Sequence, residues 1–346
     1  MFRGGQMSDF IQCVNGAIPA ADVEMILPHE HFFIDLSNQA NHGESRPVTP
    51  ADRMKLMHDP YCMTDNLPLD DLDAAVAECN ELAAMNCNLV VDCSNSCCGQ
   101  DGEKLQVLSQ AGNINIVAGC GLYTADTHPG WVKDAPVEEI TEFLMQEITC
   151  GIAPNGCRPG IIGEIGTSKT VLPAEHKALQ AAFRACKATN LAVMVHIYPW
   201  ADNGLEVLEM MRDNQIAPDR VVICHSDVTP DKDYIWEVLK QGAFIEFDNF
   251  GKEFTCEPGG FADGSFIKDT QRVKLAAGIL KSPYASQLLI TNDICLKCML
   301  RSRGGEGYTH ILRNIVPMLA QEGFELEEIK QRLLHDNPLR MLCGRL

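Results

Sequence analysis

Two histidines that flank a glutamate could bind a metal ion. His29 and His31 surround Glu30 at the end of the apolar run at residues 25–27. Side chains in a strand alternate between its faces, so the two imidazoles are expected to point the same way. Imidazoles that converge at a strand end can bind a divalent ion, but other parts of the chain must supply the remaining ligands. Taken alone, the triplet does not distinguish a metal site from surface or core histidines.

Other imidazoles and carboxylates follow later apolar runs of the chain. They are Glu164, His196, His225 and Asp293. Each one alone is compatible with a buried histidine or a helix-capping carboxylate. Burying all of them without a metal or a partner would cost several kcal/mol each on a rough scale. Together with the first two histidines they favour a metal site.

The elements that must position these residues follow a regular alternation. Short apolar runs rich in Val and Ile alternate with amphipathic segments of helical period, which is typical of a parallel sheet covered by helices. The expected strands are the opening run and residues 88–93, 114–123, 160–165, 192–197, 220–225, 243–247 and 287–293. The expected helices span residues 70–85, 102–110, 137–149, 174–188, 205–213, 234–240, 268–280, 311–321 and 326–343.

Eight strands with helices between them predict a (β/α)8 TIM barrel with an additional C-terminal helix, in which the carboxyl ends of the strands share one mouth. A doubly wound open sheet is the structural alternative. The sequence shows no composition break or low-complexity linker, so residues 1–346 are expected to form a single domain. Residues 38–68 form a long polar connection that shows neither helical nor strand periodicity.

Composition limits the classes of partner. The formal net charge of −19 and the lack of a long basic run argue against a nucleic acid, although they allow a small anionic substrate. No apolar run approaches the ~20 residues of a membrane span. The 16 cysteines are too sparse for a disulfide scaffold, and reduced core thiols indicate a cytoplasmic protein. The pair Cys295 and Cys298 has no second pair at zinc-ribbon spacing, so packing is its expected role.

Five segments carry a resemblance to the phosphotriesterase-like family of the amidohydrolase superfamily, most closely to its phosphotriesterase-related and homology-protein branches. They are residues 27–31, 160–168, 223–227, 291–293 and 304–310. The resemblance implies a centre of two divalent ions, with zinc expected and manganese or iron as alternatives. His29, His31 and Asp293 would bind the more buried ion, His196 and His225 the more exposed one. Glu164 would bridge the ions, at a position where many relatives have a carboxylated lysine.

The resemblance also implies a reaction. Two cations that share a water lower its pKa enough to give a bridging hydroxide near neutral pH, and they polarise the electrophilic oxygen of the substrate. Asp293 would accept the proton and pass it to the leaving group. Tyr123 ends the third expected strand, where similar lactonases have an aromatic residue that leans over the metals. A tyrosine on the barrel rim with its hydroxyl in water is the alternative.

The expected function is therefore a metal-dependent hydrolase of a carboxylic ester, a lactone or an amide. One alternative is an organophosphate or phosphoester hydrolase, and another is a barrel that binds a small ligand without turnover. Relatives are often homodimers, so a homodimer is also an expectation.

Basic residues near the last two strands are expected to bind an anionic group of the substrate. They are Lys252, Lys297, Arg301 and Arg303. Barrels often bind phosphate beside these two loops, and arginine suits bidentate contact with an anion. A solvated loop paired with nearby Glu306 is the alternative interpretation.

Overall fold

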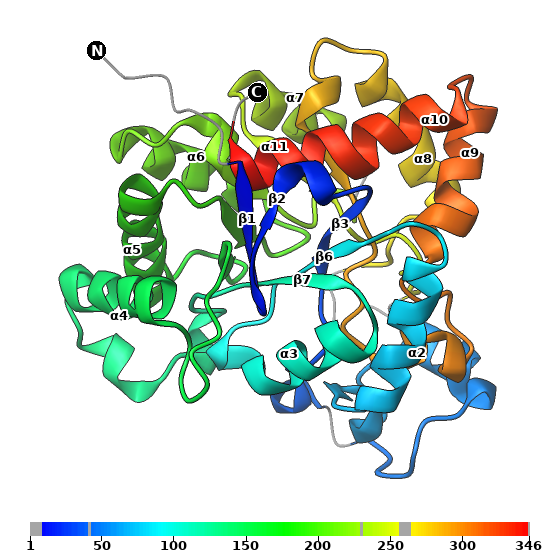
Figure 1. The fold of residues 1–346 in the computed structure, drawn as a ribbon, viewed down its shortest axis with the longest axis horizontal. Coiled ribbons are helices and arrows are strands. Elements are labelled where there is room, and N and C mark those ends of the chain that lie inside the picture. The colour runs from blue at the N-terminus through cyan, green and yellow to red at the C-terminus, as the bar shows by residue number, and fades with distance from the viewer. Residues whose placement is uncertain (1–8, 41–42, 229–230, 256–263, 345–346) are drawn as a thin grey trace.

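The computed structural model describes residues 9–40, 43–228, 231–255 and 264–344 (Figure 1). Eight parallel strands form its centre, in two hydrogen-bonded groups with the orders β3-β6-β7 and β8-β9-β10-β11-β12. The strands are β3 (Ile26–Glu30), β6 (Leu89–Asp92), β7 (Asn115–Ala118), β8 (Ile162–Gly166), β9 (Val193–His196), β10 (Val221–Ile223), β11 (Phe244–Phe247) and β12 (Leu288–Ile290). The strand count predicted from the sequence is confirmed.

Contacts across both seams bring the two groups together as a TIM barrel. The backbone N–H of Gly160 donates to the carbonyl of Ala118 at 2.9 Å, and that of Gly163 donates to the carbonyl of Cys120 at 2.7 Å. At the other seam, the hydroxyl of Thr291 donates to the carbonyl of His29 at 3.0 Å. The predicted barrel is therefore the observed fold.

Helices cover the outside of the barrel. They are α2 (Leu72–Ala83), α3 (Gly102–Ala111), α4 (Val137–Cys150), α5 (Pro173–Thr189), α6 (Asn203–Asp213), α7 (Lys232–Lys240), α8 (Asp269–Leu280) and α9 (Val316–Gln321). Capping side chains stabilise the first turns of two of these helices. The carboxylates of Asp71 and Asp101 accept hydrogen bonds from the first-turn amides of α2 and α3, both at 3.0 Å.

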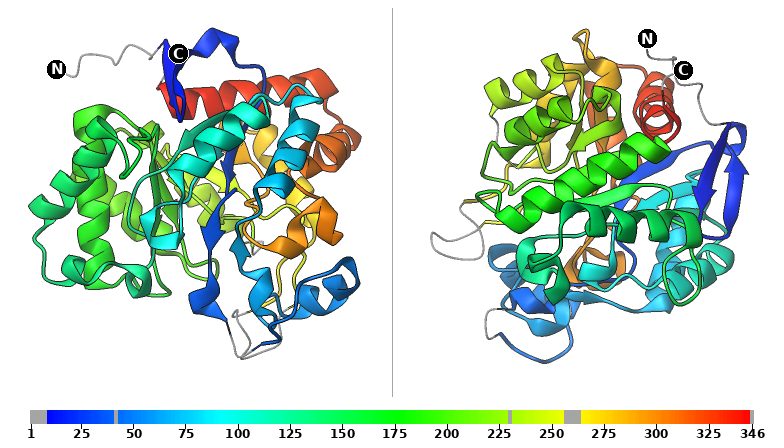
Figure 2. Two further views of the ribbon diagram at one scale, coloured as in Figure 1. Left: turned by 60° about the horizontal axis from the view of Figure 1, so that its bottom comes forward. Right: turned by 90° about the vertical axis from the view of Figure 1, so that its left-hand side faces the viewer.

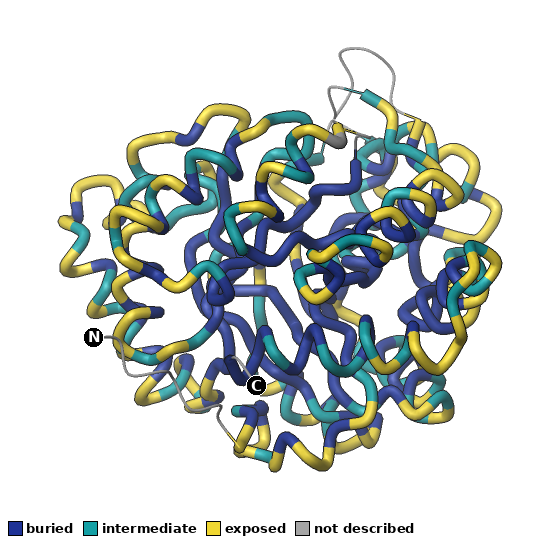
Figure 3. The backbone as a smooth tube through the Cα atoms, turned by 90° about the horizontal axis from the view of Figure 1, so that it is seen from above, coloured by how far each residue is buried: buried dark blue, intermediate teal, exposed yellow. Residues whose placement is uncertain are grey.

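Two apolar clusters fill the two sides of the strands. One contains Leu27, Val90 and Ile116 together with the inner faces of the surrounding helices. The other contains alternate strand residues such as Ile26, Leu89 and Val222, and no residue of α2 to α8, so it fills the interior of the barrel. Figure 3 shows the buried centre within a ring of partly exposed helices.

A hairpin and the last helices cover one end of the barrel. The hairpin pairs β1 (Phe10–Cys13) with β2 (Gly16–Pro19), and the sequence did not predict it. α10 (Leu326–Ile329), a stretch of wider π-helical turns (Lys330–Asp336) and α11 (Asn337–Cys343) form the predicted additional C-terminal helix. Figure 2 shows the hairpin and α11 close together near both termini.

The connection at residues 38–68 is more structured than its sequence suggested. It contains the short helix α1 (Arg53–His58), and the two-residue strands β4 (Ile34–Asp35) and β5 (Pro68–Leu69) pair at its ends. The pairing places this connection beside the mouth of the barrel, where Gln39 and Tyr61 line the cavity described below.

The cysteines and helices of the described residues are consistent with two expectations from the composition, that the cysteines are reduced and that no segment spans a membrane. The described cysteines are free thiols, and most of them, including Cys298 of the Cys295–Cys298 pair, are buried. Among the described residues, no helix has both the length and the apolar character required to cross a membrane.

Candidate metal centre

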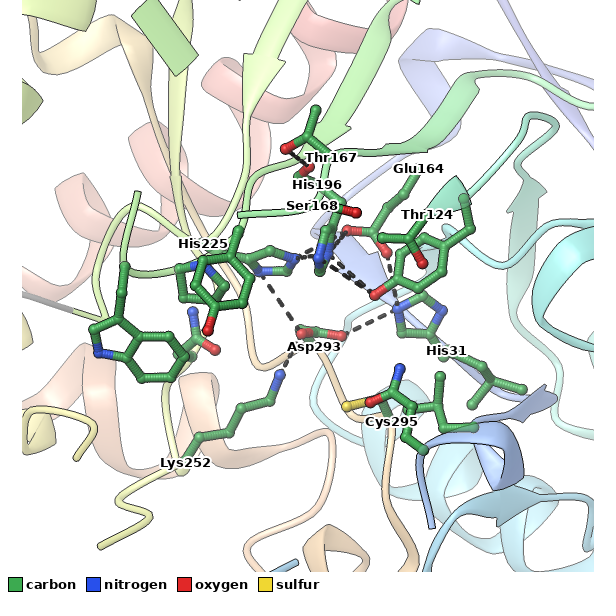
Figure 4. A pocket seen from close by; sticks show the side chains of 18 of the residues that line it. His31, Thr124, Glu164, Thr167, Ser168, His196, His225, Lys252, Asp293 and Cys295 are labelled. Atoms are coloured by element: carbon green, nitrogen blue, oxygen red, sulfur yellow. Dashed lines mark hydrogen bonds and ion pairs between the residues drawn. The ribbon is translucent and has the colours of Figure 1, made fainter. Parts of the chain in front are cut away.

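The six residues expected to bind metal meet at the carboxyl ends of the strands. β3 contributes His29 and is followed directly by His31, and Asp293 lies shortly after β12. The ligand atoms of these three residues lie within 4.8 Å of one another, as do those of Glu164, His196 and His225. The structure thus assembles both groups in the division that the resemblance implies. Figure 4 shows all of these residues except His29 around the cavity.

Glu164 lies between the two groups. Its Oε1 atom is 3.1 Å from Nε2 of His225, 3.5 Å from Nδ1 of His196 and 3.5 Å from Nε2 of His29. Its Oε2 atom is 3.7 Å from Nε2 of His31. One carboxylate therefore reaches imidazoles of both groups, which is the position required of a bridging ligand.

The donor set suits a divalent cation. The Nε2 atom of His29 is buried and makes no hydrogen bond with the described residues. It faces carboxylate oxygens of Glu164 at 3.5 Å and of Asp293 at 3.8 Å. A buried imidazole nitrogen without a hydrogen bond is costly unless another group binds it. Imidazole and carboxylate ligands suit zinc, manganese or iron, and the residues present therefore fit such an ion.

The site's carboxylates are arranged to remain ionised. Burial alone would raise the pKa of Asp293, but Lys252 and the neighbouring histidines hold that pKa below its usual range. His29, His196 and His225 likewise lower the pKa of Glu164 despite its burial. Although burial opposes it, the carboxylates of Asp248 and Glu164 raise the pKa of His225 to about 10. Binding of a metal ion would displace such imidazole protons.

Residues that the sequence analysis missed orient the imidazoles. Nδ1 of His29 lies 2.9 Å from Oε2 of Glu246, and Nδ1 of His225 lies 2.9 Å from Oδ1 of Asp248. Glu246, Asp248 and Cys224 also form a group of possible ligand atoms with His29. Hydrogen bonds to the second ring nitrogen fix the tautomer of a ligand histidine. Both carboxylates could have been recognised in the sequence as candidate site residues. Glu246 interrupts an apolar strand, and Asp248 follows two residues later on the same face.

The centre opens into a cavity of about 400 Å³. Tyr123 lines it, and its hydroxyl lies 3.2 Å from Nδ1 of His196. Lys252 also lines it and contacts Oδ2 of Asp293 with its ammonium group (Figure 4). The structure thus brings both predicted residues to the cavity, and their roles in binding or catalysis stay predictions.

The other three basic residues lie outside the lining of this cavity. The ammonium group of Lys297 is 2.9 Å from Oδ1 of Asp65, and Nε of Arg301 is 3.1 Å from Oε2 of Glu81. Arg303 lines a separate hollow of about 80 Å³. The structure therefore does not bring these three residues to the cavity, and their role in substrate binding stays a prediction. Lys297 and Arg301 are paired, as in the alternative interpretation, although their partners Asp65 and Glu81 differ from the expected Glu306.

Glu30 is a structural residue rather than a ligand. Its buried carboxylate accepts hydrogen bonds from the hydroxyl of Thr291 at 2.6 Å and from the amide nitrogen of Ile294 at 2.8 Å. It thereby ties β3 to the segment after β12 and fixes His29 and His31 relative to Asp293 within the first group.

A TIM barrel with imidazoles and carboxylates at the strand ends defines a class, the metal-dependent hydrolases. Residues 9–342 match the model of the phosphotriesterase family, and the chain belongs to that family.

Its relatives span nearly the same length. A phosphotriesterase-related protein of Nematostella vectensis is 29% identical over 336 residues, which cover 93% of this chain and 95% of the relative. An N-acetyltaurine hydrolase of Dictyostelium discoideum is 31% identical over 278 residues, 80% of this chain and 75% of the relative. The crystal structure of a resiniferatoxin-binding protein from Rhodobacter sphaeroides superposes with a TM-score of 0.93 at 28% identity, covering 98% of this chain and 96% of the other.

Proposed function

We propose that this hydrolase uses two divalent ions, with zinc expected, to cleave a carboxylic amide bond of a small anionic N-acyl compound. His29, His31 and Asp293 would hold one ion, His196 and His225 the other, and Glu164 would bridge them. The observation that carries the proposal is the position of Glu164 between the two groups in an open cavity. The amide is preferred to an ester or lactone because a relative that is 31% identical is named an N-acetyltaurine hydrolase.

The residues of the site have separate tasks in this reaction. Divalent ions bound there would activate a water and polarise the substrate carbonyl. Asp293, ionised in its surroundings, accepts a proton from the attacking water and transfers it to the leaving nitrogen. The bond between carbon and nitrogen breaks, and the products are a carboxylate and an amine. Lys252 provides a fixed positive charge at the cavity, suited to the anionic group of the leaving amine.

A hydrolysis screen tests the proposal. Protein loaded with zinc would be assayed with N-acetyltaurine, a γ-lactone, a carboxylic ester and a neutral phosphotriester, beside the variant Asp293→Asn. We expect cleavage of the amide with the highest kcat/KM and its loss in the variant. Preferred cleavage of the phosphotriester would instead indicate an organophosphate hydrolase. Binding of these compounds without any turnover would indicate the ligand-binding barrel.

A further inference from the structure

An aromatic wall lines the cavity on the side of β9. It consists of Tyr198 and Trp200, which follow β9 in the chain, and Phe266, which precedes α8. The ring centroids of Tyr198 and Trp200 are 5.8 Å apart at an interplanar angle of 61°, and those of Trp200 and Phe266 are 5.3 Å apart at 88°. Such edge-to-face contacts between aromatic rings are favourable. The three side chains therefore form one continuous apolar surface.

The aromatic wall is supported from behind. The buried ring of Phe254 packs edge-on against Phe266 at 5.4 Å, and the backbone N–H of Phe266 donates to the carbonyl of Phe254 at 2.9 Å. Gly264 lies against Trp200 so closely that a Cβ atom there would be 3.2 Å from the indole nitrogen. A surface held in place before binding loses less entropy when a ligand packs on it.

The position of the aromatic wall indicates which part of a substrate it would contact. Tyr198 and Trp200 lie two and four residues after His196, and Trp200 and His225 line both the cavity and a second hollow. Lys252 instead contacts Asp293, the residue proposed to protonate the leaving amine. With the anion of the leaving amine at Lys252, the acyl group is the part of the substrate that remains to contact the aromatic wall.

The cavity is larger than an acetylated substrate requires. Its volume of about 400 Å³ lies within the range of roughly 300–1,000 Å³ that is typical of sites for drug-sized ligands. The two carbons of an acetyl group cannot cover three aromatic rings. An acetyl substrate would leave the wall in contact with water, and the burial of apolar surface there would be lost.

We propose that the aromatic wall binds a large apolar acyl group, so that the preferred substrates are anionic N-acyl compounds with an aryl ring or a chain of about six to ten carbons. This inference rests on the proposed function. It makes Trp200 and Phe266 specificity-determining residues for the acyl group.

A series of N-acyltaurines tests the inference on the zinc-loaded protein. From acetyl to hexanoyl, kcat/KM is expected to rise about fourfold per methylene group. Trp200→Ala and Phe266→Ala should each remove most of the difference between hexanoyl and acetyl substrates. Trp131→Ala is the matched control, because Trp131 makes a similar edge-on contact with Phe143 at 5.4 Å outside the cavity lining. An acetyl preference in the parent protein, or an equal effect of the control, would overturn the inference.

A binding measurement separates this inference from the proposed function. Calorimetry should show octanoate binding at least tenfold more tightly than acetate, with the advantage lost in Trp200→Ala. Equal binding of the two acids would overturn the role of the wall even if amides are cleaved. Preferential cleavage of N-acetylphenylalanine over N-acetyltaurine would overturn the assignment of the acyl group to the wall. Tight octanoate binding without cleavage of any amide would overturn the proposed function and leave the wall as an apolar subsite.

Discussion

Lys252 contacts Oδ2 of Asp293 at the base of the cavity, although the ammonium group is almost fully buried. The backbone carbonyl of Lys252 accepts a hydrogen bond from the buried guanidinium of Arg272 at 3.1 Å. Arg272 in turn pairs with Asp227 at 3.0 Å and with Asp269 at 2.9 Å. The loop after β11 therefore holds one positive charge in a fixed position beside the proposed proton acceptor.

Removing this charge should change the selectivity for anionic substrates. For Lys252→Met, we expect the ratio of kcat/KM for N-acetyltaurine to that for a neutral N-acetylamine to fall by about tenfold or more, because a hydrogen bond to a charged group contributes roughly 1.5–3 kcal/mol. The ratio cancels effects on Asp293 that are common to both substrates. Lys297→Met is the control, since Lys297 pairs with Asp65 outside the cavity. A similar fall in both variants would contradict the account.

Glu246 should support metal binding through His29. Replacing it with glutamine alters the charge at Nδ1 of His29, 2.9 Å away, without a change in size. Loss of such a partner typically weakens metal affinity about 10- to 100-fold. Competition with a chromogenic chelator measures the affinity for zinc. Glu147→Gln, at a buried glutamate of α4 outside both groups of metal-site residues, should leave it unchanged.

Glu147 should make the stability of the protein depend on pH. Burial raises the pKa of its carboxyl from 4.5 to about 7 in the folded protein. Between these values the folded state binds more protons than the unfolded state, so the free energy of unfolding falls as pH rises and stays lowered above pH 7. At about 1.4 kcal/mol per pKa unit, Glu147→Gln should stabilise the protein by up to roughly 3 kcal/mol at pH 8 and by little near pH 4.5. Urea unfolding at both pH values tests this, and a gain that does not depend on pH would refute it.

Arg272 should be far more important for stability than a surface arginine. Arg272→Met removes a fully buried cation and leaves Asp227, which is also fully buried, without its charge partner. Breaking a buried pair on one side typically costs about 3–5 kcal/mol. Arg332→Met, at an exposed pair with Glu328, should cost less than about 1 kcal/mol. Chemical denaturation compares the two variants, and equal losses would show that the buried network contributes little.

The barrel and the six candidate ligands could be predicted from the sequence because each ligand lies in or directly after an apolar strand, near its carboxyl end. His225 and Asp293 could be placed at the mouth from strand order alone, since the carboxyl ends of parallel barrel strands converge. Glu246 and Asp248 were missed although Glu246 interrupts an apolar strand, because their partners His29 and His225 are identified only by the contacts of the folded chain. The hairpin of β1 and β2 was missed because its strands are short and partly exposed.

The basic residues show that a position close to a strand end in the sequence does not by itself place a side chain in the site. Lys297 and Arg301 follow β12 closely, yet they pair with Asp65 and Glu81 outside the cavity. Arg303 lines a separate hollow. Which way a loop side chain points depends on partners far away in sequence. Trp200 and Phe266 were missed for the same reason, because they meet only where two loops pack together.

The metal content of the protein tests the central claim most directly. Protein purified without chelator and reconstituted with zinc should contain about two ions per chain by elemental analysis, as expected for a two-metal site. Glu164→Gln should contain fewer, since it alters the carboxylate proposed to bridge the ions, whereas Glu147→Gln should match the parent protein. A parent protein that binds no zinc under these conditions would contradict the account.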